Sequence, residues 1–206
     1  MLKERKVSLI SCDVSSLVVD TLCKQAAGGN FAVACFYFDF TGQKDQSPAA
    51  ILGSVLKQIV GGLDEVPEGI VRAFQDRERV IGGRKLVLSQ IVKFLRGILS
   101  SRRTFICIDA LDECQERHRV ELLDSLHQIL QGSPGARVFL TGRPHIRDEV
   151  EKLLSRSVAT RSIAPTDGDI GKFLKARLEE DAIEDAMDES LQEEIIRNVT
   201  KIFSEM

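Results

Sequence analysis

The sequence predicts an α/β protein with a mostly parallel sheet. Short apolar runs that suit buried strands alternate along the chain with longer segments of helical periodicity. Glycine and proline clusters separate many of these segments. The 206 residues are 43% hydrophobic and 29% charged, which is typical of a globular domain large enough to bury a core without disulfides or metal.

The strand candidates are the apolar runs 7–10, 31–40, 104–109, 137–141 and, as the weakest, 158–163. Helices are expected between them. Residues 15–26 carry apolar side chains on one face and stop before Gly28 and Gly29. Ser47 and Pro48 predict an N-cap and a first helical residue, opening a helix to about residue 60.

Further helices are expected over 86–99 and 117–130, each directly before a strand candidate. Two amphipathic helices, 167–180 and 189–206, follow the last strand candidate and are joined by an acidic stretch. The chain ends inside a helical pattern, which we interpret as a truncation or as a frayed terminus.

Charge and cysteine content narrow the classes of function. The formal net charge is −3, which argues against a nucleic-acid partner or an anionic membrane surface, since both need clustered cations. No segment reaches the ~20 apolar residues of a membrane span. The five cysteines show no C-x-x-C spacing, a pattern that favours a reducing compartment. We therefore expect a soluble, cytoplasmic protein.

Three carboxylates follow the strand candidate 104–109: Asp109, at its end, then Asp112 and Glu113. Ligands of open α/β sheets bind at that edge. Asp109 is the candidate metal ligand, and Asp112 and Glu113 are candidates for orienting a water that attacks a terminal phosphate. The alternative is a helix N-terminus whose dipole favours acidic residues.

The strand candidate 137–141 leads to the same predicted edge. It delivers Thr141 and, just beyond, Arg143, either of which could sense a γ-phosphate. The alternative for Arg143 is a surface ion pair with a neighbouring carboxylate, which contributes little stability.

Together these segments resemble the NACHT-type signal-transduction NTPases of the STAND class, and most closely the fungal family with a nephrocystin-3-like N-terminal domain. The segment FICIDALDEC resembles the Walker B strand of that family, VFLTGRP its sensor-1 strand, and FYFDF with QKDQ its second strand and following loop. The resemblance implies a three-layer P-loop NTPase-like core with a mostly parallel sheet, followed by a C-terminal helical segment. It implies Mg²⁺ and ATP or GTP as ligands.

The sequence departs from that family at the phosphate-binding loop, G-x-x-x-x-G-K-[ST]. Residues 6–16, KVSLISCDVSS, contain no glycine and no lysine beyond Lys6 at their start, so they do not supply the amide cradle and the ammonium that bind phosphates. Ser15 or Ser16 could take the position of the hydroxyl. We expect weak or absent nucleotide binding.

The expected organisation is a divergent N-terminus over 1–14 with a possible first strand, a NACHT-like core over 15–165 and the start of a helical segment over 166–206. The expected function is a truncated or degenerate signalling NTPase domain acting as a scaffold or regulatory module, with protein partners or self-association. The alternative is an active ATP- or GTP-binding signalling NTPase whose Walker A motif lies upstream. A phosphotransferase with Asp109 as nucleophile fits less well, because such enzymes need two aspartates two residues apart.

Overall fold

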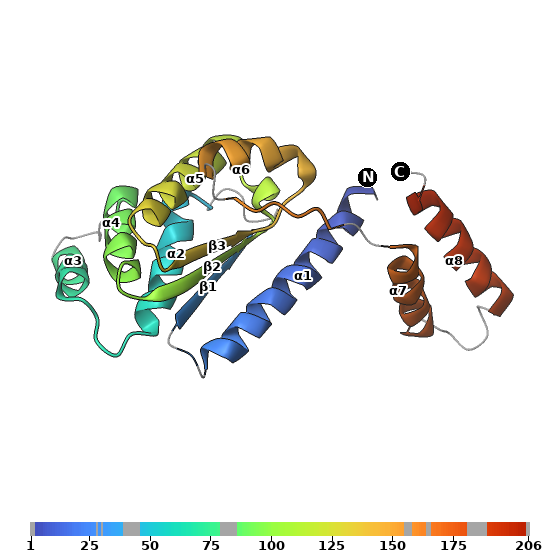
Figure 1. Cartoon of the computed structure of the whole chain (residues 1–206), viewed down its shortest axis with the longest axis horizontal. Coiled ribbons are helices and arrows are strands. Elements are labelled where there is room, and N and C mark those ends of the chain that lie inside the picture. The colour runs from blue at the N-terminus through green and yellow to red at the C-terminus, as the bar shows by residue number, and fades with distance from the viewer. Residues whose placement is uncertain are drawn as a thin grey trace. The chain divides into compact units, whose positions relative to one another are not determined.

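A computed structural model describes residues 3–27, 29, 31–38, 46–78, 86–154, 158–163, 166–180 and 189–204 (Figure 1). Their contacts form two compact units, 1–159 and 160–206. The elements in chain order are α1 (Lys3–Ala26), β1 (Phe31–Tyr37), α2 (Pro48–Gly61), α3 (Glu68–Glu78), α4 (Leu88–Leu99), β2 (Arg103–Asp109), the 3₁₀ turn η2 (Leu111–Glu113), α5 (Glu116–Gln131), β3 (Ala136–Leu140), the 3₁₀ turn η3 (Pro144–Ile146), α6 (Arg147–Leu154), α7 (Asp167–Glu180) and α8 (Glu189–Ser204).

The first unit contains a parallel three-stranded sheet in the order β1-β2-β3. Cys35 pairs with Cys107, and Cys107 pairs with Phe139, across the three strands. Parallel neighbours need crossover connections, and helices supply them: α2 to α4 between β1 and β2, and α5 between β2 and β3. The predicted α/β class is confirmed.

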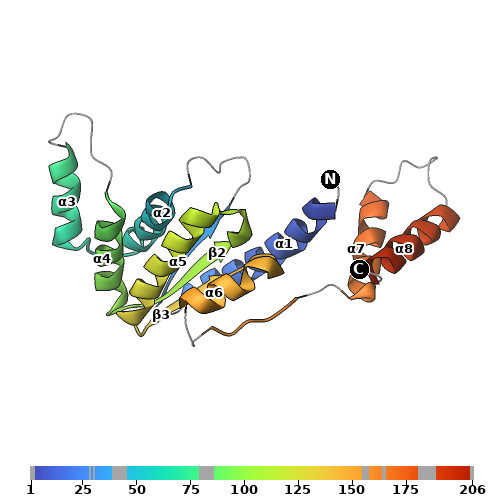
Figure 2. The same ribbon diagram turned by 90° about the horizontal axis from the view of Figure 1, so that it is seen from above.

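The two faces of the sheet are covered differently. Alternate strand residues such as Ala34, Ile106 and Ile108 are buried in one core cluster with side chains of α2, α4, α5 and α6. On the opposite face α1 contacts β1 and β2. Figure 1 shows α1 on one side of the sheet, and Figure 2 shows α5 and α6 from above, with α1 running beneath. The unit therefore has three layers.

The structure confirms two helix ends that capping residues in the sequence predicted. The hydroxyl of Ser47 accepts a hydrogen bond from the Ala50 N–H at 3.3 Å, and Pro48 is the first residue of α2. The Gly132 N–H donates to the Ile129 carbonyl at 3.2 Å and ends α5. The expected helices over 86–99, 117–130 and 167–180 correspond to α4, α5 and α7.

Two strand predictions are wrong. Residues 7–10 lie inside α1, which begins at Lys3, so they form no first strand. Residues 158–163 have no strand assignment and do not join the sheet. Both are short segments that mix apolar and polar residues, and periodicity over four to six residues does not distinguish a strand from other structure. Of the run 31–40, β1 covers Phe31–Tyr37, while residues 39 and 40 lie outside the described residues.

The second unit contains α7 and α8, which pack against each other. Thr166 and Asp169 form reciprocal hydrogen bonds at the start of α7: the Asp169 N–H donates to Thr166 Oγ1 at 3.2 Å, and the Thr166 N–H donates to Asp169 Oδ2 at 3.0 Å. This is a capping box, with aspartate in place of the usual glutamate. Its hydrogen bonds lower the pKa of the Asp169 carboxyl.

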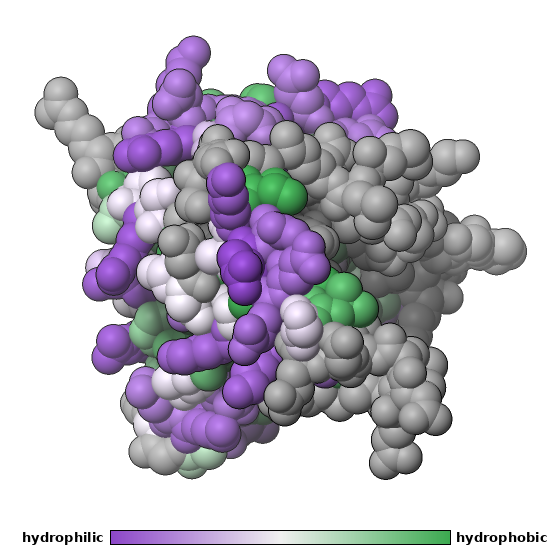
Figure 3. Space-filling view, turned by 90° about the vertical axis from the view of Figure 1, so that its right-hand side faces the viewer, coloured by the Kyte–Doolittle hydropathy of each residue, from purple (hydrophilic) through white to green (hydrophobic). Residues whose placement is uncertain are grey.

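Charged and polar side chains dominate the described part of the face in Figure 3, and apolar residues form small separate groups there. None of the helices in the described ranges has the length and apolar character needed to cross a membrane.

Candidate functional site

Three oxygen-bearing side chains meet at the carboxyl end of β2. Asp109 is the last residue of β2 and is 6% exposed. Its Oδ1 accepts hydrogen bonds from the hydroxyls of Ser15, on α1, and Thr141, directly after β3. The two hydroxyl oxygens lie 3.4 Å apart. The structure therefore brings together three of the residues that the sequence predicted for one site.

The turn after β2 fixes Thr141 in this cluster. Ala110 adopts a left-handed conformation with φ 55° and ψ 44°. Its N–H donates to Thr141 Oγ1 at 3.0 Å, and the next N–H, of Leu111, donates to the Thr141 carbonyl at 2.9 Å. Because Oγ1 accepts from a main-chain amide, its own proton is free to be donated to Asp109.

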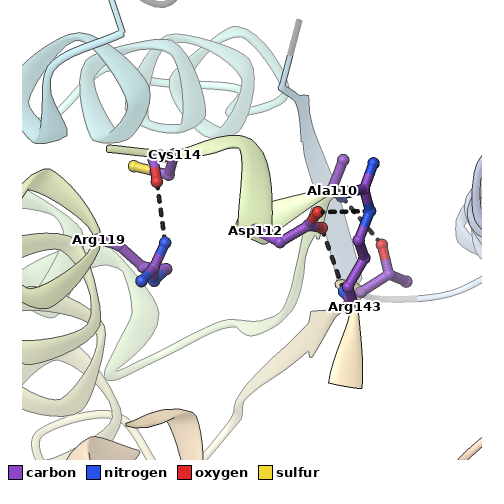
Figure 4. Close-up of polar contacts among 6 residues, drawn as sticks. Ala110, Asp112, Cys114, Arg119 and Arg143 are labelled. Carbon is purple, nitrogen blue, oxygen red and sulfur yellow. Dashed lines mark hydrogen bonds and ion pairs between the residues drawn. The ribbon is translucent and has the colours of Figure 1, made fainter. Parts of the chain in front are cut away.

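Asp112 and Arg143 form a second pair at the same edge (Figure 4). Asp112 Oδ2 lies 3.2 Å from Arg143 Nε, and Asp112 Oδ1 accepts from the Arg143 N–H at 3.2 Å. The Asp112 side chain is only 8% exposed. Both oxygens of Asp112 thus contact Arg143, which favours the ion-pair interpretation over a water-orienting base in this conformation.

Gly142, between Thr141 and Arg143, lies close to Ile146 and Asp112. A Cβ at this position would lie 2.7 Å from Ile146 Cδ1 and 3.4 Å from Asp112 Oδ1. A residue with a Cβ at this position would therefore have to displace the Ile146 side chain.

Arg119, on α5, anchors the segment that follows. Its Nε and Nη2 lie 2.9 and 2.8 Å from Glu149 Oε2, on α6. Its Nη1 donates to the Cys114 carbonyl at 2.9 Å, as Figure 4 shows. Arg119 is 9% exposed. Burial raises the pKa of the Cys114 thiol to about 11, so Cys114 is a poor nucleophile near neutral pH.

Two further residues predicted for the site are Ser16 and Glu113. Ser16 is exposed and lies near Tyr37. Glu113 lies in η2, and its N–H donates to the Ala110 carbonyl at 2.9 Å. Of the two serines, Ser15 is the one whose hydroxyl donates to Asp109. Burial is the largest cause that raises the pKa of the Tyr37 hydroxyl.

Sequence reasoning missed the partly buried ion pair of Arg119 and Glu149 and the helix α6 that carries Glu149. An arginine three residues into a helix and a glutamate thirty residues later give no periodic signal. Only the packing of α5 against α6 places these two residues together.

The site fits a divalent cation better than it fits phosphate. A carboxylate and two hydroxyl oxygens are the ligand types that Mg²⁺ accepts. Phosphate needs free amides at a helix N-terminus or a cation. Ser15, however, lies about three turns inside α1, where main-chain amides are engaged in the helix, and no described cation forms an ion pair with Asp109.

Fold and site together define an α/β domain with a carboxylate cluster at the carboxyl edge of its parallel sheet. The sequence model of the family described as Nephrocystin 3, N-terminal, matches residues 13–143. The match spans more than half of the chain, including the sheet and every predicted site residue, and the chain belongs to this family. No curated protein and no solved structure matches the chain.

Proposed function

We propose that this chain is a degenerate NACHT-type signalling domain that acts as a scaffold or regulatory module, with weak or absent nucleotide binding. One observation carries the proposal. Ser15 and Thr141 both donate to Asp109, an arrangement that could serve as the metal side of a nucleotide site, while α1 continues through Ser15 without a loop before it.

The helix explains why the phosphate side would be weak. In a phosphate loop, successive amides point at the ligand and the following helix begins there. Residues 7–14 of this chain are instead helical, so their amides donate to carbonyls four residues earlier. Arg143 is the cation nearest to this cluster along the chain, and it is already engaged in an ion pair with Asp112.

If Mg²⁺ binds, Ser15, Asp109 and Thr141 are the residues that would hold it, and the ion would supply charge neutralisation to a bound phosphate. We also propose that the protein is cytoplasmic. Four of the five cysteines, Cys23, Cys35, Cys107 and Cys114, are free thiols, as is usual in a reducing compartment.

Isothermal titration of the full chain with ATP and with GTP, each with Mg²⁺, tests the proposal. We expect no saturable binding in the micromolar range. Micromolar binding that Asp109→Asn abolishes, and that the matched control Asp124→Asn on the exposed face of α5 leaves intact, would overturn it. That result would favour the alternative, an ATP- or GTP-binding signalling NTPase.

A further inference from the structure

The two outer edges of the sheet differ in the hydrogen-bond partners of their main-chain groups. At the outer edge of β1, the Cys35 N–H donates to Gln58 Oε1 at 3.0 Å, and the Cys35 carbonyl accepts from Gln58 Nε2 at 2.8 Å. The side-chain amide of Gln58 therefore takes the place of a neighbouring strand. At the outer edge of β3, the described residues supply no neighbouring strand. Exposed strand edges of this kind favour pairing with another strand.

The hydrogen bonds to β2 show which residues of β3 face outward. The Thr104 N–H donates to the Gly135 carbonyl at 3.2 Å, and the Thr141 N–H donates to the Ile108 carbonyl at 3.1 Å. Alternate residues of a strand direct their main-chain groups to the same side, so positions 135, 137, 139 and 141 face β2. The outward residues of β3 are Ala136, Val138 and Leu140.

The main-chain N–H and carbonyl of Ala136 already have hydrogen-bond partners. Its N–H donates to the Ser133 carbonyl at 2.9 Å, and its carbonyl accepts from Arg137 Nη1 at 2.8 Å. Within the described ranges no group hydrogen-bonds with the outward main-chain groups of Val138 and Leu140, which are therefore open to an incoming strand. The side chains of both residues are half-buried against the core, so a strand added here would extend an apolar layer.

We propose that a second copy of this chain pairs with β3 in antiparallel orientation, about a two-fold axis at Phe139. The inference rests on the proposed scaffold role and gives that scaffold a partner. In this register Val138 of each copy exchanges two hydrogen bonds with Leu140 of the other, and the two Phe139 residues form the non-hydrogen-bonded pair between them. The edge is thus complementary to itself, as a two-fold interface requires.

Neighbouring registers are less favourable. An axis at Leu140 would place Arg137 opposite Arg143 of the second copy, and directly opposed like charges destabilise a strand pair. An axis at Val138 would place Leu140 opposite Ala136, whose N–H already donates to the Ser133 carbonyl. Among these three registers, the axis at Phe139 alone satisfies all the outward groups without opposing two arginines.

Charge complementarity supports the same register. It places Arg137 of one copy opposite Thr141 of the other, on the sheet face that also carries Asp109. Thr141 follows β3 in register with Asp109, so Arg137 lies about two strand spacings, each about 4.8 Å, from that carboxylate. Arg137 is exposed and forms no ion pair with a described side chain. The second copy would therefore bring a guanidinium to the buried carboxylate.

Sedimentation velocity of the full chain, from micromolar to sub-millimolar concentration, tests the pairing. We expect a reversible dimer of low affinity, because the shared edge is short. Val138→Pro removes an outward N–H and should raise the dissociation constant by about tenfold or more. Val33→Pro, the same substitution at an outward position of β1, should not change it. A monomer at every concentration, or equal effects of the two variants, would overturn the proposal.

The arginine contact has its own test. Arg137→Glu should weaken the dimer and Arg137→Lys should largely retain it, with a stronger effect at low salt. If Arg137 contacts Asp109 of the other copy, Arg137→Glu should cost less in an Asp109→Asn background. Additive effects of the two substitutions would rule out this contact. A chain that binds no nucleotide and stays monomeric would overturn this inference and leave the proposed function standing.

A cross-link keeps the register testable if Val138→Pro fails to fold. The axis places position 139 opposite itself, so Phe139→Cys, oxidised with glutathione disulfide, should yield a peptide linked between the two copies through residue 139. In that step two thiols form one disulfide, and glutathione disulfide is reduced to two glutathione molecules. A dimer that shows links at other cysteines but not at residue 139 would contradict the register.

Discussion

Ala110 determines the local geometry of the site at the scale of one residue. Among the described residues other than glycine it has a positive φ, 55°, and this conformation directs its N–H to Thr141 Oγ1. The left-handed region costs an L-residue with a side chain about 1–2 kcal/mol. Part of the folding free energy is therefore stored in the turn that shapes the carboxylate cluster.

Ala110→Gly should raise the free energy of unfolding by up to about 1.6 kcal/mol, because the steric cost is removed while only about 0.4–1 kcal/mol is lost through the freer unfolded chain. Ala110→Val should lower it by about 1–3 kcal/mol. Denaturant titration checks both. Ala73→Gly, in the middle of α3, is the control and should lose about 0.5–1 kcal/mol. A loss on Ala110→Gly would contradict this account.

The cysteines differ in reactivity because they differ in burial. Burial raises the pKa of Cys107 and of Cys114 to about 11, whereas Cys23 is exposed. Iodoacetamide at neutral pH should therefore modify Cys23 well before Cys107 or Cys114, as read by peptide mass spectrometry. In denaturant the three rates should converge. Faster labelling of Cys114 in the native protein would show that it is not buried.

The same shifts predict a pH dependence of stability. The pKa of both buried thiols is raised from 9.0 in the unfolded chain to about 11. The stabilisation linked to their protonation is fully present below pH 9 and declines as the pH rises toward 11. The denaturation midpoint should fall over that interval, and Cys107→Ala with Cys114→Ala should reduce the slope.

At the scale of elements, the stability of α2 depends on its N-cap residue Ser47, which the sequence predicted. Ser47→Ala removes the acceptor for the Ala50 N–H and should lower the free energy of unfolding by about 1 kcal/mol. The control is Ser89→Ala in the first turn of α4, where Ser89 is exposed and is not the capping residue. Its effect should be close to zero. Equal losses in the two variants would show that the Ser47 cap contributes nothing specific.

Helices α3 and α6 were not predicted from the sequence. Both are short, and each carries a single residue below one-tenth exposure among its described side chains, Ile70 in α3 and Leu154 in α6. A helix that buries so little has a weak apolar stripe, and its stability depends on its neighbours rather than on its own periodicity. The predicted helices α2, α4 and α5 each bury five or more residues.

At the scale of the whole molecule, the core belongs to the first unit. The core cluster and the residues packed on it lie between Ala34 and Val158, inside unit 1–159. A chain ending at Ala159 should therefore keep a cooperative thermal transition close to that of the full chain, measured by circular dichroism. Loss of cooperativity on removing 160–206 would show that the two units fold together.

The sequence alone determined the strands β1, β2 and β3 and the helices with strong apolar stripes, because their apolar patterns are local and long enough to read. It also determined that Asp109 and Thr141 would share an edge, since parallel strands place their carboxyl ends together. The family match covers the same segments. The sequence did not determine the structure of residues 7–10, where four apolar and polar residues fit either a strand or a helix.

Only the tertiary structure decided which groups touch. It brought the Ser15 hydroxyl to Asp109, paired Asp112 with Arg143, and joined Arg119 to Glu149 across two helices. It also left one edge of the sheet covered by Gln58 and the other without a partner strand among the described residues. These contacts depend on the orientation of one element against another, and that orientation follows from the packing of the whole core rather than from any short stretch of sequence.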